Sequence, residues 1–164
     1  MMRFDTKYVT KAALIAAMYV VLILVQMIPA ASFTFGAVQL RLAEGLTLLP
    51  FVEAAAIPGV FLGCLISNII LAGVSGLGLV DVIGGSLVTL AAAYLTSKAK
   101  NKYLAAVPPV LLNGLIVSIW VSYYTNMPYG ITVLGIAGGE ALSVFLFGGL
   151  VLYVYERSKI FRRF

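Results

Sequence analysis

Apolar segments long enough to cross a lipid bilayer recur along this chain and leave few other ways for it to fold. A transmembrane helix needs about 20 predominantly apolar residues, and clear segments of this kind run at about residues 10–29, 79–97, 105–124 and 131–155. Only 10% of the residues are charged, against about 25% in soluble domains. The sequence therefore predicts an all-α, polytopic membrane protein that forms a single integral membrane domain over residues 1–164.

A further apolar stretch, residues 46–72, is too long for one comfortable span and short for two, and Pro50 and Pro58 interrupt it. The positive-inside rule decides between the two interpretations. Two spans, at about 42–56 and 58–73, give six in total and place every basic cluster on one side of the membrane. These clusters are Arg3, Lys7 and Lys11; Lys98, Lys100 and Lys102; and Arg157, Lys159, Arg162 and Arg163. We therefore predict a six-transmembrane-helix bundle with both termini in the cytoplasm.

Several kinds of chemistry are excluded by residues that the chain lacks. There is no histidine, and Cys64 is the single cysteine, so a disulfide within the chain and His-based acid–base catalysis are ruled out. No metal site or cofactor is expected. The net charge of +5 follows the predicted topology and does not indicate nucleic-acid binding.

Four charged residues depart from the basic clusters and map near or inside apolar spans, toward the opposite side: Arg41, Glu44, Asp81 and Glu140. An ionisable group within the bilayer costs a few kcal/mol or more, so it indicates function by default. Other hydrogen-bonding or aromatic residues map to the same outer half: Gln39, Asn68, Asn113, Trp120 and Tyr123. Apolar walls with a few placed polar groups are typical of a small-molecule site. We interpret the set as the lining of an outward-facing solute cavity.

The charged residues also have structural interpretations. Asp81 can cap the fourth span, and Arg41 and Glu44, three residues apart, can form an ion pair on one helix face. Glu140 has no lysine or arginine in its own span. It is therefore the residue that a purely structural account explains least well.

The uncharged candidates are open to the same two interpretations. Asn68 and Asn113 can join helices through hydrogen bonds. Trp120 and Tyr123, with Tyr124, fit an aromatic belt at the membrane surface. A structural membrane subunit is thus one alternative to a solute-binding protein, and a small membrane enzyme is another.

The first span carries two overlapping patterns of small residues, Ala12 with Ala16 and Ala13 with Ala17. Such spacing lets helices approach closely in lipid. Packing within the bundle is the usual meaning. The position of these alanines on an outermost span also fits a flat face for another membrane subunit.

Five motifs, considered in order, resemble the QueT family over most of the chain. They are VQLRLAEGLTLLPF at residues 38–51, IPGVFLGCLISN at 57–68, GLVDVIGGSL at 78–87, PPVLLN at 108–113 and GGE at 138–140. This family comprises the substrate-binding (S) components of energy-coupling-factor (ECF) transporters. The resemblance implies a six-helix bundle of the ECF S-component type in a prokaryotic cell membrane.

The resemblance also implies a ligand and partners. The ligand is a queuosine precursor, a 7-deazaguanine such as preQ0, preQ1 or queuine. The partners are a transmembrane coupling subunit and two ATPase subunits. The alanine patterns of the first span resemble the motif that docks the coupling subunit. This chain has no Walker motif, so ATP hydrolysis is assigned to the partners and not to this chain.

The candidate residues suit such a ligand. A deazaguanine presents a ring N–H beside an exocyclic amine, and a carboxylate accepts both; Glu140 is the first choice. Asn68 and Asn113 fit the carbonyl and ring nitrogen, and Asp81 or Glu44 an aminomethyl cation. The same polar set is compatible with another flat vitamin, such as folate, riboflavin or a tryptophan-like ligand.

Overall fold

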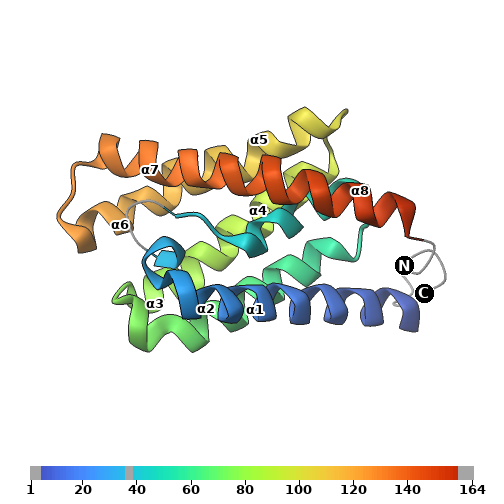
Figure 1. Cartoon of the computed structure of the whole chain (residues 1–164), viewed down its shortest axis with the longest axis horizontal. Coiled ribbons are helices and arrows are strands. Elements are labelled where there is room, and N and C mark those ends of the chain that lie inside the picture. The colour runs from blue at the N-terminus through green and yellow to red at the C-terminus, as the bar shows by residue number, and fades with distance from the viewer. Residues whose placement is uncertain (1–4, 36–38, 159–164) are drawn as a thin grey trace.

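The structure, a computed structural model, describes residues 5–35 and 39–158, and every regular element in these residues is helical (Figure 1). Five helical stretches are long and apolar enough to cross a membrane: Thr6–Ala30, Ala56–Ser75, Gly78–Ser97, Lys102–Thr125 and Tyr129–Arg157. The all-helical, multi-pass architecture predicted from the sequence is therefore confirmed.

Several of these stretches are built from more than one element. Their order is α1 (Thr6–Phe35), η1 (Leu42–Phe51), α2 (Ala56–Ser75), α3 (Gly78–Val80), η2 (Asp81–Gly85), α4 (Ser86–Ser97), α5 (Lys102–Leu112), η3 (Asn113–Val117), α6 (Ser118–Thr125), α7 (Tyr129–Leu142), η4 (Ser143–Gly148) and α8 (Gly149–Arg157). The elements η2, η3 and η4 are π-helical turns within otherwise α-helical spans. Such turns are rare, and those that are found often lie at functional sites.

The segment predicted as the second span takes a form that the sequence pattern did not indicate. Residues Leu42–Phe51 form a 3₁₀ helix, which at about 2 Å per residue covers about 20 Å, less than the roughly 30 Å of a bilayer core. Its residues from Ala43 to Pro50 are all buried. A helix that is apolar on every side belongs inside a protein, and η1 accordingly lies within the bundle, against η4, α4, α1 and α8.

Three parts of the chain that carry basic residues meet at one end of the molecule. Figure 1 shows the start of α1, the α4–α5 junction and the end of α8 at this end. We call it the basic end; its described cations are Lys7, Lys11, Lys98, Lys100, Lys102 and Arg157. The predicted topology requires these charges to share one side, and the side of the membrane on which they lie stays a prediction.

The glycines of α2 let this helix pack tightly on α1. A Cβ on Gly63 would lie 2.5 Å from the Tyr19 Cβ, and one on Gly59 would lie 3.0 Å from the Ala12 carbonyl oxygen. Ala12 and Ala16 are buried on the same face of α1. These two alanines therefore contribute to packing inside the chain, as small residues commonly do in membrane helices.

The other two alanines of the first span face away from the bundle. Ala13 and Ala17 are exposed. Of the four residues predicted to meet a partner subunit, only this pair lies on the outer surface of α1.

Candidate functional site

A short extended segment, Gln39–Arg41, crosses the half of the bundle that lies away from the basic end (Figure 1), and we call it the strap. Its backbone rests directly on α7, because a Cβ on Gly139 would lie 1.9 Å from the Gln39 carbonyl oxygen. The Arg41 N–H donates to Ser143 Oγ at 3.0 Å, and the Ser143 hydroxyl donates to the Gly139 carbonyl at 2.9 Å. A glycine and a serine one helical turn apart thus fix the strap to the end of α7.

Gln26 of α1 holds the other side of the strap. Its amide nitrogen donates to the Leu40 carbonyl, and its Oε1 accepts the Leu42 N–H at 2.7 Å. The first residues of a helix leave backbone N–H groups without helical partners, and Gln26 satisfies one of them for η1. Sequence reasoning did not single out Gln26 or Ser143, although an amide in an apolar span was an available signal.

Arg41 extends from the strap into the bundle, where it meets Glu44. The Arg41 Nη1 lies 3.9 Å from Glu44 Oε1, and its Nε donates to the Thr34 carbonyl. The predicted pairing of Arg41 with Glu44 is therefore present, and the Glu44 carboxylate offsets the burial of the guanidinium charge.

Tyr19 is a partner of Glu44 that no sequence pattern indicated. Its hydroxyl donates to Glu44 Oε1 at 2.6 Å, and both side chains are buried. Charge-assisted hydrogen bonds of this length are among the stronger ones in proteins. The carboxylate of Glu44 is therefore oriented from two sides.

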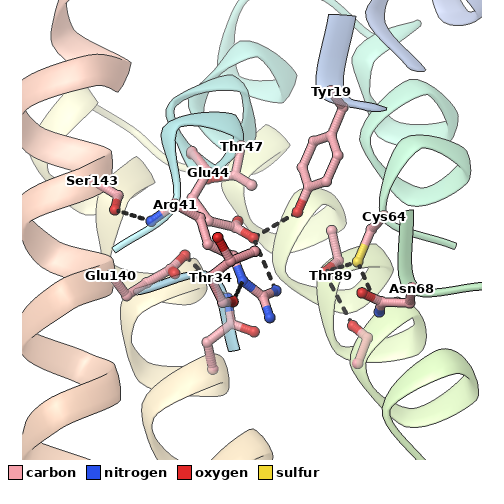
Figure 2. Close-up of polar contacts among 12 residues, drawn as sticks. Tyr19, Thr34, Arg41, Glu44, Thr47, Cys64, Asn68, Thr89, Glu140 and Ser143 are labelled. Carbon is pink, nitrogen blue, oxygen red and sulfur yellow. Dashed lines mark hydrogen bonds and ion pairs between the residues drawn. The ribbon is translucent and has the colours of Figure 1, made fainter. Parts of the chain in front are cut away.

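Glu140 approaches the same centre from α7. Asn113, the first residue of the π-helical turn η3, donates its amide to Glu140 Oε1 at 3.0 Å. Figure 2 shows Glu140, Arg41 and Glu44 extending toward one another from α7, the strap and η1. Residues separated by as many as 99 positions in the sequence thus form one buried cluster.

Asp81 anchors a second group of polar residues beside the first. Its Oδ1 accepts the Trp120 indole N–H at 3.0 Å, and its carbonyl accepts from the Asn68 amide at 3.0 Å. Glycines make room for these contacts, since a Cβ on Gly84 would lie 3.3 Å from the Trp120 ring and one on Gly85 would lie 3.2 Å from Asp81 Oδ1. Asp81 is the fourth residue of its span, which begins at Gly78, so it lies inside the helix and not at its cap, and its carboxylate faces Trp120.

The tyrosines that follow Trp120 are interpreted from the sequence either as a ligand contact, for Tyr123, or as part of an aromatic belt, for Tyr123 and Tyr124. Tyr123 is 77% exposed and Tyr124 46%, and their rings meet edge to face with centroids 5.5 Å apart. The structure does not bring Tyr123 into the buried cluster. The Tyr123 side chain lies on the exposed surface of the bundle.

Four buried side-chain atoms have no hydrogen-bond partner among the described residues: Gln39 Nε2, Glu44 Oε2, Ser67 Oγ and Ser118 Oγ. Buried polar groups are nearly always paired, and an unmade bond costs about 1–3 kcal/mol. Gln39 and Glu44 belong to the cluster around Arg41. The cluster is thus left with one donor, Gln39 Nε2, and one acceptor, Glu44 Oε2, that have no partner among the described residues.

The cluster is closed to solvent in this structure. Glu44, Asn68, Asp81, Asn113 and Glu140 each expose less than a tenth of their surface. Across residues 5–35 and 39–158, no group of three or more acidic or cysteine residues has metal-binding geometry. The arrangement therefore concentrates hydrogen-bonding groups and charge in one buried centre.

Comparison with known proteins gives one match. The model of the QueT transporter family matches residues 9–157, almost the whole chain. No curated protein and no solved structure matches it. The matched family is one of transporters and not of enzymes.

Proposed function

The chain belongs to the QueT transporter family, and on this premise we propose that it is the substrate-binding component of an ECF-type ABC importer. It captures a queuosine precursor, a 7-deazaguanine such as preQ0, preQ1 or queuine, at the outer side of the membrane. The observation that carries the proposal is the convergence of Arg41, Glu44 and Glu140 in a buried cluster with unpaired polar atoms.

Glu140 is the proposed anchor for the ligand. Asn113 occupies only one of its carboxylate oxygens, and a carboxylate has several acceptor positions. The adjacent N–H groups of a deazaguanine edge pair with such an acceptor. Asn113 orients the carboxylate, and the free Oε2 of Glu44 offers a second acceptor a short distance away.

The balance of charge in the cluster favours a ligand rich in donors. Among the residues that the structure describes, the buried acidic side chains of Glu44, Asp81 and Glu140 share one cation within the bundle, Arg41. Unpaired carboxylates are costly to bury, and N–H donors or an aminomethyl cation on the ligand offset that cost. Asn68 and Trp120, joined through Asp81, supply an amide and a flat ring on the neighbouring side.

The transport cycle follows from the same proposal. Six crossings, the second made by the strap and the short helix η1 together, place both termini and the basic end in the cytoplasm of a prokaryotic cell. A transmembrane coupling subunit and two ATPase subunits supply the energy. The exposed pair Ala13 and Ala17 is the part of the alanine motif available to the coupling subunit. The strap, which closes the cluster, is the segment that opens to admit the ligand.

Equilibrium binding of a 7-deazaguanine to the detergent-solubilised protein tests the proposal. Glu140→Gln and Asn113→Ala are expected to weaken binding by at least tenfold, because a hydrogen bond to a charged group contributes about 1.5–3 kcal/mol. Leu134→Ala is the matched control, since this α7 residue is 76% exposed. Unchanged affinity in both cluster variants would remove the cluster from the ligand site.

A further inference from the structure

An apolar groove lies on the other side of η1 from the polar cluster, between α1 and α8. It has a volume of about 210 Å³ and is lined by Ile15, Met18, Leu46, Leu49, Leu150, Val151, Val154 and Tyr155. Ile15, Leu46 and Leu49 are buried and form its floor, whereas Leu150 and Val154 are more than half exposed and form one wall. The groove therefore opens sideways, where a membrane protein meets lipid.

Cations continue both walls of the groove toward the basic end. On α1, Lys11 and Lys7 lie seven and eleven residues before Met18, on the same helix face. On α8, Arg157 lies three residues after Val154 and seven after Leu150. Lys7 and Arg157 are both exposed, and the Arg157 guanidinium lies over the Tyr153 ring, 4.8 Å from its centroid.

Glu53 occupies the closed end of the groove. Its Oε2 lies 2.6 Å from Lys11 Nζ and accepts a hydrogen bond of 2.6 Å from the Tyr155 hydroxyl. Glu53 therefore neutralises Lys11. These contacts also tie α1, the η1–α2 connection and α8 together around the closed end. Lys7 and Arg157 form no ion pair among the described residues, and their acidic neighbours in the sequence, Asp5 and Glu156, are exposed.

We propose that this groove binds one acyl chain of an anionic phospholipid, with the headgroup phosphate held by Lys7 and Arg157. An apolar cavity stays free of water, so the groove takes an apolar occupant. Cationic side chains at a membrane surface attract anionic headgroups, by roughly fivefold in binding for each charge. The apolar lining and the basic mouth are the two halves of one lipid site.

The charge at the groove mouth distinguishes this occupant from an apolar helix of a partner protein. Lys7 and Arg157 are exposed cations, which an anionic headgroup matches and an apolar helix does not. The bound lipid covers the floor residues of η1, the element that also carries Glu44.

Native mass spectrometry of the full chain, delipidated in detergent and titrated with phosphatidylglycerol or phosphatidylcholine, tests the proposal. The wild-type protein is expected to retain one phosphatidylglycerol preferentially. The double variant Lys7→Gln/Arg157→Gln is expected to lose roughly tenfold or more of this preference. Lys98→Gln/Lys102→Gln is the control, because it removes two cations of the same end that lie away from the groove.

A groove-filling variant tests the apolar half separately. Leu150→Trp is expected to lower retention of either lipid, whereas Ile119→Trp, at a 60% exposed position on α6, is not. Both positions are exposed, so folding is preserved. Equal effects of the two charge pairs, equal retention of both lipids by the wild type, or full retention by Leu150→Trp would overturn the proposal. Displacement of the lipid by a co-purified protein segment seated in the groove would do the same.

Discussion

Replacement of Gly139 by alanine is expected to separate the strap from α7. The added Cβ would lie 1.9 Å from the Gln39 carbonyl oxygen, whereas ordinary contacts begin at 3.4 Å. The strap must therefore retreat by about 1.5 Å. The hydrogen bond from the Arg41 N–H to Ser143 Oγ, 3.0 Å long, lies two residues further on and is lost when the strap moves by this amount.

The energetic effect follows from these two changes. Overpacking of a tight contact costs about 1–3 kcal/mol, and leaving the Arg41 N–H unpaired in a buried position costs about another 1–3 kcal/mol. If ligand binding requires the closed strap, a penalty of about 2 kcal/mol raises the dissociation constant by up to about thirtyfold, and the full factor applies once the open strap predominates. Hydrogen exchange of residues 39–42 is expected to accelerate to the same extent.

Gly138→Ala provides the matched control for this experiment. It neighbours Gly139 on α7, but nothing lies within 4 Å of its added Cβ, and alanine favours a helix by up to about 1 kcal/mol. Binding isotherms and hydrogen exchange of both variants should therefore diverge. If Gly139→Ala binds ligand and protects the strap as well as Gly138→Ala does, the strap does not close the site.

Two further predictions concern packing and pH. In Gly63→Ala the added Cβ would lie 2.5 Å from the Tyr19 Cβ, so a denaturation assay should show a free energy of unfolding lower by about 1–3 kcal/mol. Gly73→Ala is the control, because open space surrounds its added Cβ. Equal stabilities of the two variants would contradict tight α1–α2 packing. Burial of the Glu53 carboxylate opposes its charge, but the hydrogen bonds from Lys11 and Tyr155 outweigh this effect and lower the pKa of Glu53. Ionised Glu53 therefore stabilises the folded protein above the pKa that Glu53 has in the unfolded chain. This stabilisation is lost as the pH falls through the pKa of Glu53 in the folded protein. Thermal midpoints measured from about pH 6 down to pH 3 should therefore decline less in Glu53→Gln than in the wild type, and parallel curves would argue against this contribution.

The sequence predicted the architecture to the extent that burial in lipid determines it. Apolar length identified the membrane-spanning stretches, and the distribution of lysine and arginine predicted that separate basic clusters share one side. The resemblance to the QueT family is confirmed by the family match over residues 9–157. Hydropathy reports burial but not helical pitch, so the 3₁₀ form of η1 and the three π-helical turns could not be read from the same pattern.

The candidate site shows a similar division. Arg41, Glu44 and Glu140 were identifiable because charges in apolar surroundings need a reason, and the structure brings them together. Tyr19 was not, because a tyrosine in an apolar span fits core packing and its contact with Glu44 depends on tertiary structure. Small-residue spacing likewise indicates close approach without naming the neighbour, so Ala12 and Ala16 turned out to face α2 within the chain.

Mass spectrometry of small molecules that co-purify with the detergent-solubilised protein tests the central claim most directly. The account predicts a 7-deazaguanine, present in the wild-type protein and depleted in Glu140→Gln but retained in Leu134→Ala. A different flat vitamin in its place would contradict the proposed specificity while preserving a solute-binding role. The absence of any such ligand, with no binding when a 7-deazaguanine is added, would contradict the account of the buried polar cluster as a ligand site.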